Sequence, residues 1–70
     1  MKIYSLYSSQ KKNGVYPKKF VKVVVQRKTW FMVEGVLTIN EIERCDLVYH
    51  GHNMSHSMCM DEIERLENQL

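Results

Sequence analysis

Five side chains that favour soft metal ions fall within the second half of the chain. They are two cysteines and three histidines, namely Cys45, His50, His52, His56 and Cys59. Thiolate sulfur and neutral imidazole nitrogen are preferred ligands of Zn²⁺, and the spacing of His52 and His56 would place both rings on one face of a helix. The chain has no CxxC or CxxH pair, however, and both cysteines fall on apolar stripes where a thiol packs as a small hydrophobic group. We predict no bound metal or cofactor, and retain a small metal-binding protein as an alternative.

A cysteine nucleophile is the second kind of chemistry that the sequence offers. Cys59 has His56 and Asp61 as sequence neighbours, so a thiol, a base and an orienting acid lie close together along the chain. Such triads depend on geometry rather than on proximity in sequence, and no P-loop, dinucleotide fingerprint or carboxylate dyad is present. A chain of 70 residues also rarely holds both a substrate cleft and the residues that support a catalytic site. We therefore predict a protein that is not an enzyme.

The charged residues divide the chain into a basic and an acidic half. Residues 1–35 carry eight basic side chains and one acidic side chain, a net charge of +7. Residues 36–70 carry two basic and seven acidic side chains, a net charge of −5, and the whole chain has a net charge of +2. Such polarity can form an electropositive face for nucleic acid or an acidic partner, and it can equally be neutralised within the fold or between two copies that pair opposite patches.

The segment 20–37 is the most strand-prone part of the sequence and predicts a β-hairpin at the centre of a sheet. With a loop at 27–29, Lys22 would lie opposite Glu34 as a cross-strand pair of opposite charge. The inner face would then hold the apolar side chains of Val21, Val23, Val25, Phe31 and Val33. The outer face would hold Phe20, Val24, Trp30, Met32 and Val36.

Residues 3–7 predict a first strand in which alternate side chains face opposite sides of the sheet. Tyr4 and Leu6 would lie on one side, and Ile3, Ser5 and Tyr7 on the other. Residues 8–19 are polar and rich in lysine, with the turn dipeptide Asn13-Gly14 and a proline at position 17, so they predict a loop. Gly35 predicts a bend at the end of the hairpin.

Two helices are predicted in the second half. Thr38 and Glu41 have the spacing of a capping box, which predicts a short helix near 39–45. Its inward side chains would be Ile39, Ile42 and Cys45. A C-terminal helix near 58–69, capped by Ser57, follows from an apolar stripe of Cys59, Ile63, Leu66 and Leu70.

A further strand is predicted at 47–49, closed by His50-Gly51 and followed by a polar loop. The elements together predict one small α+β domain over residues 1–70. Its three- to four-stranded, mostly antiparallel sheet is built on the hairpin at about 20–37. No apolar run reaches the ~20 residues that span a bilayer, and the N-terminus does not resemble a signal peptide. We therefore expect a cytoplasmic protein with free thiols and no membrane contact.

The expected function is a non-enzymatic module that binds a larger protein or complex and modulates or inhibits it. In size and lack of motifs the chain resembles the small stand-alone inhibitors and adaptors that phages and mobile elements encode. The predicted partner-binding residues lie on the hairpin and are Phe20, Lys22, Arg27, Lys28, Trp30 and Met32. Trp and Met are enriched at interface cores, and the basic residues would steer an acidic partner.

Nucleic-acid binding is the first alternative, because the basic hairpin offers phosphate contacts and Trp30 offers a stacking face. Homodimer formation is kept as a further alternative, since it would cover an apolar outer face and pair the two charged halves. The identity of a partner does not follow from the sequence.

Overall fold

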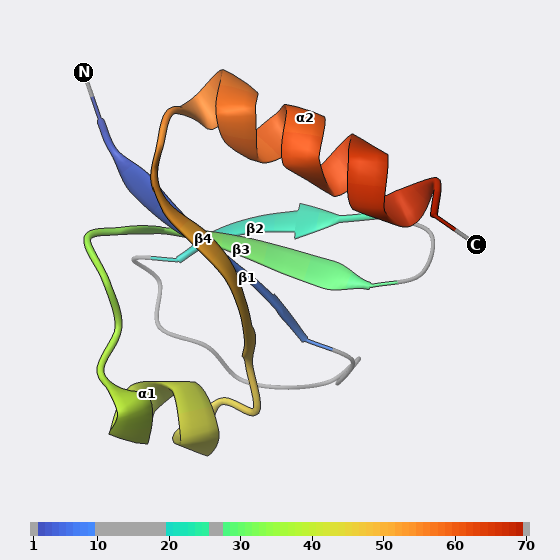
Figure 1. Ribbon diagram of the computed structural model, residues 1–70. Helices are drawn as coiled ribbons and strands as arrows, with labels where there is room; N and C mark the ends of the chain where they lie inside the picture. The colour runs from blue at the N-terminus through green and yellow to red at the C-terminus, as the bar shows by residue number, and fades with distance from the viewer. Residues whose placement is uncertain (1, 10–19, 26–27, 70) are drawn as a thin grey trace.

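The computed structural model describes residues 2–9, 20–25 and 28–69 (Figure 1). Four strands and two helices follow one another along the chain. They are β1 (Tyr4–Ser9), β2 (Val21–Val24), β3 (Thr29–Glu34), α1 (Ile39–Arg44), β4 (Val48–Met54) and α2 (His56–Glu67). The predicted α+β class, with one sheet, one short helix and one C-terminal helix, is confirmed.

The strands form one antiparallel sheet in the order β2-β3-β1-β4. The hairpin of β2 and β3 therefore forms, but it lies toward one side of the sheet, and β3 and β1 are the two inner strands. β1 pairs with β3 in an unbroken register in which Tyr4 lies opposite Glu34 and Ser9 lies opposite Thr29. Its pairing with β4 has two register shifts.

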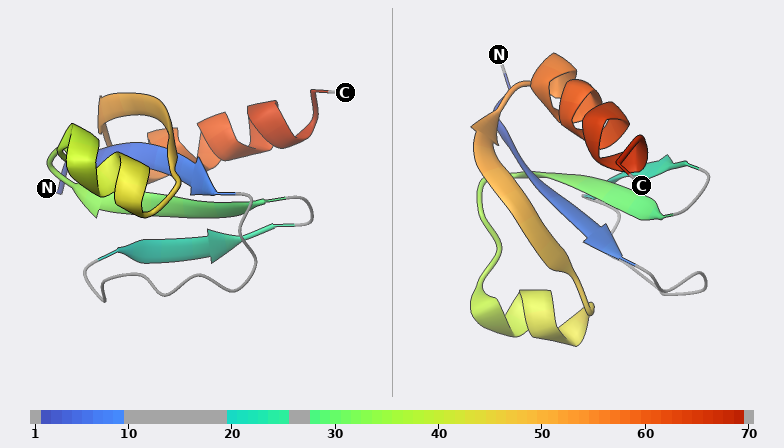
Figure 2. Two further views of the ribbon diagram at one scale, coloured as in Figure 1. Left: turned by 90° about the horizontal axis from the view of Figure 1, so that it is seen from below. Right: turned by 45° about the vertical axis from the view of Figure 1, so that its right-hand side comes forward.

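Both faces of the sheet carry a hydrophobic cluster, because side chains alternate along the inner strands. The helix α2 lies along one face (Figure 2). The cluster under it consists of Tyr4, Leu6, Trp30, Met32, Cys59 and Ile63. The cluster on the other face, toward α1, consists of Tyr7, Phe20, Phe31, Val33, Leu37 and Leu47. The predicted alternation of β1 is confirmed, since Tyr4 and Leu6 pack in the first cluster and Tyr7 in the second.

The predicted register of the hairpin is wrong. Lys22 lies opposite Phe31 and Val23 opposite Trp30, whereas Glu34 lies opposite Tyr4. The backbone N–H of Val25 donates to the carbonyl of Lys28 at 3.2 Å, so the strands join across residues 26–27, which lie outside the described part of the chain. A change of register by an odd number of residues exchanges the two faces of a strand. The valines of β2 at 21 and 23 therefore share a face with Trp30 rather than with Phe31.

The capping box is confirmed at the start of α1. The Thr38 hydroxyl accepts from the backbone N–H of Glu41 at 3.2 Å, and the Glu41 carboxylate accepts from the N–H of Thr38 at 3.1 Å. Ile39 was expected to face inward but is 74% exposed, whereas Ile42 and Cys45 pack against the second cluster. A helix of six residues packs only one side against the sheet. Ile39 is its first residue and lies on the side that faces solvent.

The strand β4 is longer and the helix α2 begins earlier than the sequence predicts. β4 continues through His50 and Gly51 to Met54, and Ser55 rather than Ser57 caps α2 by accepting from the N–H of Met58 at 3.3 Å. Most of the predicted histidine loop is therefore strand and helix. Two bulges let β4 keep pairing with β1 despite its glycine.

The bend predicted at Gly35 is present, with φ of 80° directly after β3. This backbone conformation favours glycine, and the Ser5 hydroxyl donates to the Gly35 carbonyl. The predicted turn at 13–14, Pro17 and Leu70 lie outside the described residues. Neither described helix has the length and apolar character needed to cross a bilayer.

Candidate functional site

Three of the predicted partner-binding residues belong to the core, so their assignment to an exposed face is wrong. Trp30 is 1% exposed, Met32 is 0% exposed and Phe20 is 8% exposed. Trp30 and Met32 pack under α2, and the Phe20 ring contacts the Phe31 ring edge-on at 5.7 Å between centroids on the opposite face. The sequence reasoning left one face of the hairpin uncovered, whereas the structure buries both faces of β3.

The basic residues of the hairpin have different positions. Lys22 is exposed on β2, and the Lys28 ammonium lies 5.6 Å from the centroid of the Trp30 ring as a cation–π pair. Arg27 lies outside the described residues. Because the Trp30 ring is buried, it offers no face on which a nucleotide base could stack, and this part of the nucleic-acid alternative is wrong.

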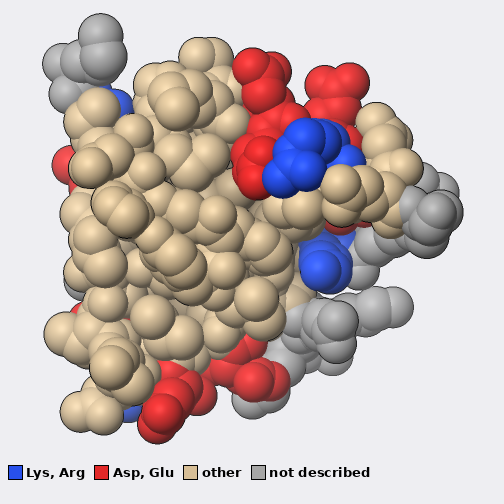
Figure 3. Space-filling model, in the orientation of Figure 1, with Lys and Arg blue, Asp and Glu red and all other residues tan. Residues whose placement is uncertain are grey.

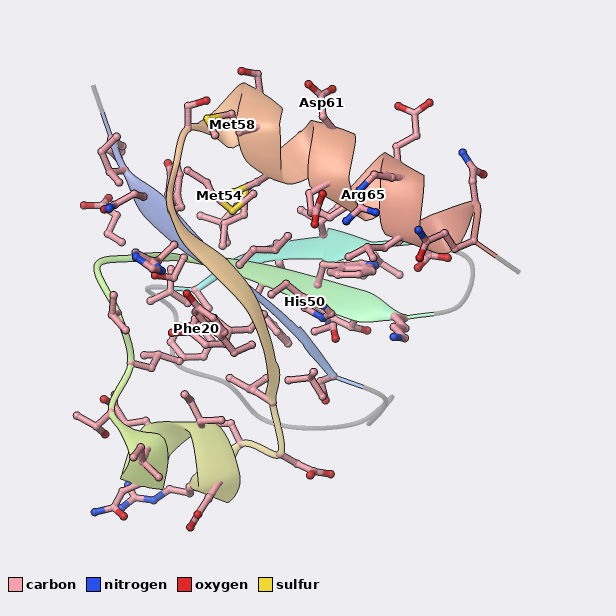
Figure 4. All side chains as sticks on the ribbon, viewed as in Figure 1. Phe20, His50, Met54, Met58, Asp61 and Arg65 are labelled. Carbon is pink, nitrogen blue, oxygen red and sulfur yellow. The ribbon has the colours of Figure 1, made fainter. Side chains whose placement is uncertain are left out.

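A polar cluster centred on His50 lies beneath α2. The His50 ring leaves β4 on the side of the sheet that α2 covers (Figure 4). Its Nε2 lies 2.6 Å from the Ser8 hydroxyl oxygen, and its ring centroid lies 4.9 Å from that of Trp30. Burial lowers the pKa of His50, Lys28 lowers it further, and Glu62 opposes the change. The imidazole is therefore neutral at neutral pH.

Carboxylates of α2 complete this cluster. The Trp30 indole N–H donates to the Glu67 carboxylate at 3.0 Å, which ties β3 to the last turn of α2. Arg65 donates to both carboxylate oxygens of Glu62, at 2.9 and 2.7 Å, and this pairing lowers the pKa of Glu62. The Ser8–His50 and Trp30–Glu67 pairs thus satisfy polar groups beneath α2, which is typical of a structural network, whereas the Arg65–Glu62 pair lies on the surface of the helix.

Two side chains with nucleophilic chemistry, Ser8 and Cys59, are buried. A serine hydroxyl bound to a histidine can act as a nucleophile, but Ser8 is 1% exposed. Cys59 is fully buried, and burial raises the pKa of its thiol, which disfavours the reactive thiolate. The predicted grouping of Cys59 with His56 and Asp61 therefore has no exposed nucleophile.

The predicted metal ligands do not converge. Among residues 2–9, 20–25 and 28–69, no three histidine, cysteine or acidic side chains are placed to hold one ion. His50 points under α2, while the His52 ring stacks on Tyr49 and bonds to its hydroxyl. Cys45 packs with the cluster near α1, far along the chain from the buried Cys59. The two histidines of β4 therefore lie in different surroundings, His50 half-buried beneath α2 and His52 exposed.

The side of the molecule formed by β4 is uncharged. Figure 3 shows this surface in the orientation of Figure 1, with acidic groups gathered above it on α2 and below it at α1. The sequence of β4, Val48 to Met54, contains no Asp, Glu, Lys or Arg. We call this surface the β4 face; it comprises β4 and the first turn of α2, which follows it.

Large apolar side chains are exposed along the β4 face. Val48 is 55% exposed and Tyr49 is 46% exposed on β4 itself. The first turn of α2 adds the exposed side chain of Met58. Met58 lies on the first turn of α2, near the end of β4 (Figure 4). Val48 and Tyr49 leave β4 on opposite sides, so both sides of this uncharged outer strand expose an apolar side chain, and apolar surface with a charged border is typical of interaction sites.

The β4 face is suited to side-chain contact more than to strand pairing. The two register shifts against β1 bulge the strand, and Asn53 adopts φ of 55°. Bulges interrupt the regular row of backbone donors and acceptors that an added strand needs. Tyr49 and the histidine at position 52 instead present aromatic rings with polar atoms, which bind apolar and polar groups together.

A small groove lies elsewhere, between α2 and the end of β2. Its volume is about 280 Å³, and it is lined by Val25, Met60, Asp61, Ile63, Glu64, Glu67 and Asn68. This volume is slightly below the range of about 300–1,000 Å³ typical of small-molecule sites. The groove is open and carries no group with catalytic chemistry beyond surface carboxylates.

Comparison with protein-family models gives no match. Searches of curated proteins and of solved structures also find no match. Function is therefore inferred from the chemistry of the surface itself.

The sequence did carry a signal for the β4 face. Residues 47–60 contain no Asp, Glu, Lys or Arg, although charged residues make up 26% of the chain. Our sequence reasoning divided this run between a short strand, a loop and a helix, and so overlooked it as one uncharged surface. The exposure of Val48 and Tyr49 depends on β4 being an outer strand, which the local sequence does not reveal.

Proposed function

We propose that the protein is a non-enzymatic binding module that attaches to a larger protein or complex through the β4 face, and modulates it by doing so. The observation that carries the proposal is an outer strand without charge that exposes Val48 and Tyr49 between two acidic helices. Charged residues are depleted at the centres of protein interfaces, and aromatic residues and methionine are enriched there.

The charge around the β4 face indicates the chemistry of its partner. α1 and the residues after it contribute the exposed acids Glu43 and Asp46, and α2 contributes Asp61 and Glu64. A partner surface with an apolar centre and basic residues on two sides would complement this arrangement. Two copies of this chain meeting through their β4 faces would bring acidic borders together, so we propose a different protein as the partner.

Binding through this face would require little rearrangement. β4 is held by its pairing with β1, the Tyr49 ring packs edge-on against the buried Tyr7 ring at 5.9 Å, and Met54 packs on the cluster beneath α2. Side chains fixed in this way lose little conformational freedom on binding, which favours affinity.

The test uses two charge substitutions at exposed valines. Val48→Asp places a charge in the β4 face, whereas Val24→Asp makes the same change on β2, where Val24 is 68% exposed. The immobilised wild-type chain and the Val24→Asp variant should capture one and the same protein from the native host, and Val48→Asp should lose it while its circular dichroism stays native. If Val24→Asp lost the captured protein while Val48→Asp retained it, the proposal would be refuted.

A further inference from the structure

The two outer strands of the sheet differ in regularity. β2 pairs with β3 without a register shift from Val21 to Val24, whereas β4 pairs with β1 through two shifts. Among the strands that the structure describes, β2 is hydrogen-bonded to β3 on one side only. A regular outer strand presents every second N–H and C=O group to its outer side, and such a row pairs readily with an extended peptide.

The side chains of β2 are exposed in a pattern that suits an added strand. Val21 is 42% exposed, and Lys22 and Val24 are exposed on the opposite face of the strand. Val23 is half-buried against the cluster beneath α2. A neighbouring strand would therefore meet apolar side chains on the α2 side and an ammonium group on the other side.

The charge of β2 selects the kind of strand. Lys22 lies within β2, and Lys28 directly precedes β3. The sequence on both sides of β2 is also basic and contains Lys18, Lys19 and Arg27. Pairing of β2 with the β2 of a second copy would bring lysines together, which is unfavourable. An extended strand that alternates acidic and apolar residues would instead place carboxylates near Lys22 and apolar side chains beside Val21 and Val23.

We propose that β2 binds an extended acidic peptide segment of a partner protein by adding it to the sheet as a fifth strand. This site is distinct from the β4 face and binds a different partner, and its occupant is recognised by backbone pairing as well as by charge. Backbone hydrogen bonds supply the affinity, and the alternation of carboxylate and apolar side chains supplies the selectivity.

The experiment uses the full chain labelled with ¹⁵N and an acetylated peptide that alternates glutamate and valine. As the peptide is added, the backbone amide shifts of the protein should change saturably at residues 20–25 and stay constant at residues 48–54. Two further peptides carry N-methyl groups on alternate amides, so that each removes one of the two sets of N–H donors. In an added strand only one of the two sets of N–H groups points toward β2. The peptide methylated on that set should bind at least about tenfold more weakly than the other, as expected for the loss of two or more hydrogen bonds. Equal binding of both methylated peptides would overturn the proposal, because attraction by charge alone does not distinguish them.

Charge reversal supplies the matched controls. Lys22→Glu should weaken binding of the glutamate–valine peptide and favour a lysine–valine peptide of the same length. Arg44→Glu makes the same change of net charge on α1 and should leave the affinity unchanged. A similar loss with Arg44→Glu would overturn the proposal by showing that net charge alone governs binding. Val48→Asp should retain peptide binding, so a failure of the β4 face and a failure of this site give different results.

Discussion

The indole N–H of Trp30 donates to the Glu67 carboxylate at 3.0 Å and so joins the inner strand β3 to the last turn of α2. Trp30 is also in contact with the His50 ring and with the Lys28 ammonium. A side chain with these contacts and 1% exposure supports the fold from within. The surface available to a partner is therefore sought among the outer strands.

Replacing Trp30 by alanine should unfold the protein or leave it close to unfolding. Truncation of a buried Trp lowers the free energy of unfolding by about 3–5 kcal/mol, which is comparable with the whole stability of many small domains. Thermal denaturation followed by circular dichroism measures this loss. Val24→Ala, at an exposed position, should change the free energy of unfolding by less than about 0.5 kcal/mol. A native, stable Trp30→Ala variant would show that the ring does not lie in the core.

Glu67→Ala should destabilise the protein more than Glu64→Ala does. Removing the Glu67 carboxylate leaves the buried Trp30 N–H without its acceptor, which costs about 1–3 kcal/mol. Glu64 lies on the same helix and is exposed, so it controls for the loss of charge from α2. Urea denaturation gives both free energies of unfolding, and the fluorescence of the single Trp reports the changed surroundings of its ring. Equal stabilities of the two variants would contradict the role of the hydrogen bond.

Tyr7→Phe should lower the free energy of unfolding by about 1–3 kcal/mol, because it leaves a buried backbone N–H without an acceptor. The Tyr7 hydroxyl oxygen accepts from the N–H of Leu37 at 3.0 Å, and Tyr7 is fully buried. Tyr49→Phe removes the same hydroxyl group at an exposed position and should have a smaller effect. Chemical denaturation measures the free energy of unfolding of both variants. A Tyr49→Phe variant less stable than the Tyr7→Phe variant would contradict the role of this hydrogen bond.

The sequence was informative where local chemistry decides the structure. The capping box at Thr38 and Glu41 predicted the start of α1, and the alternation of Tyr4 and Leu6 with Tyr7 predicted the two faces of β1. In each case a few neighbouring residues contain the whole signal, because capping and strand alternation act over short distances.

The hairpin register and the candidate site could not be obtained in the same way. The pairing of Lys22 with Glu34 was inferred from a loop at 27–29 that keeps charge off the apolar face, but Lys22 lies opposite Phe31. Trp30 and Met32 are buried for a separate reason, because α2, about thirty residues further along the chain, covers their face of β3. Which strand is outermost also depends on pairings between distant segments of the chain. Local sequence patterns therefore could not predict that Val48 is exposed.

The stability of the protein should fall in mild acid because of His50. Burial and the nearby Lys28 hold the pKa of His50 below its ordinary value of 6.5 in the folded protein. As the pH falls below about 6.5, the unfolded chain binds a proton at this residue before the folded chain does, so the free energy of unfolding decreases until the folded-state pKa is passed. Urea denaturation between pH 8 and pH 5 measures the slope.

His50→Gln supplies the control for this pH dependence, since it removes the titrating group and keeps a polar side chain near Ser8. The variant should lose less stability than the wild type over the same pH range. A wild-type slope equal to that of His50→Gln would contradict the assignment to His50.

The most direct test of the central claim maps the contact on the protein itself. The partner captured by the wild-type chain is added to ¹⁵N-labelled protein, and hydrogen exchange is measured for each backbone amide with and without it. The account predicts added protection at Val48–Met54 and on the first turn of α2, around Met58, with little change at Val21–Val24. Protection confined to Val21–Val24, with exchange along β4 unchanged, would contradict the claim that the β4 face holds the partner.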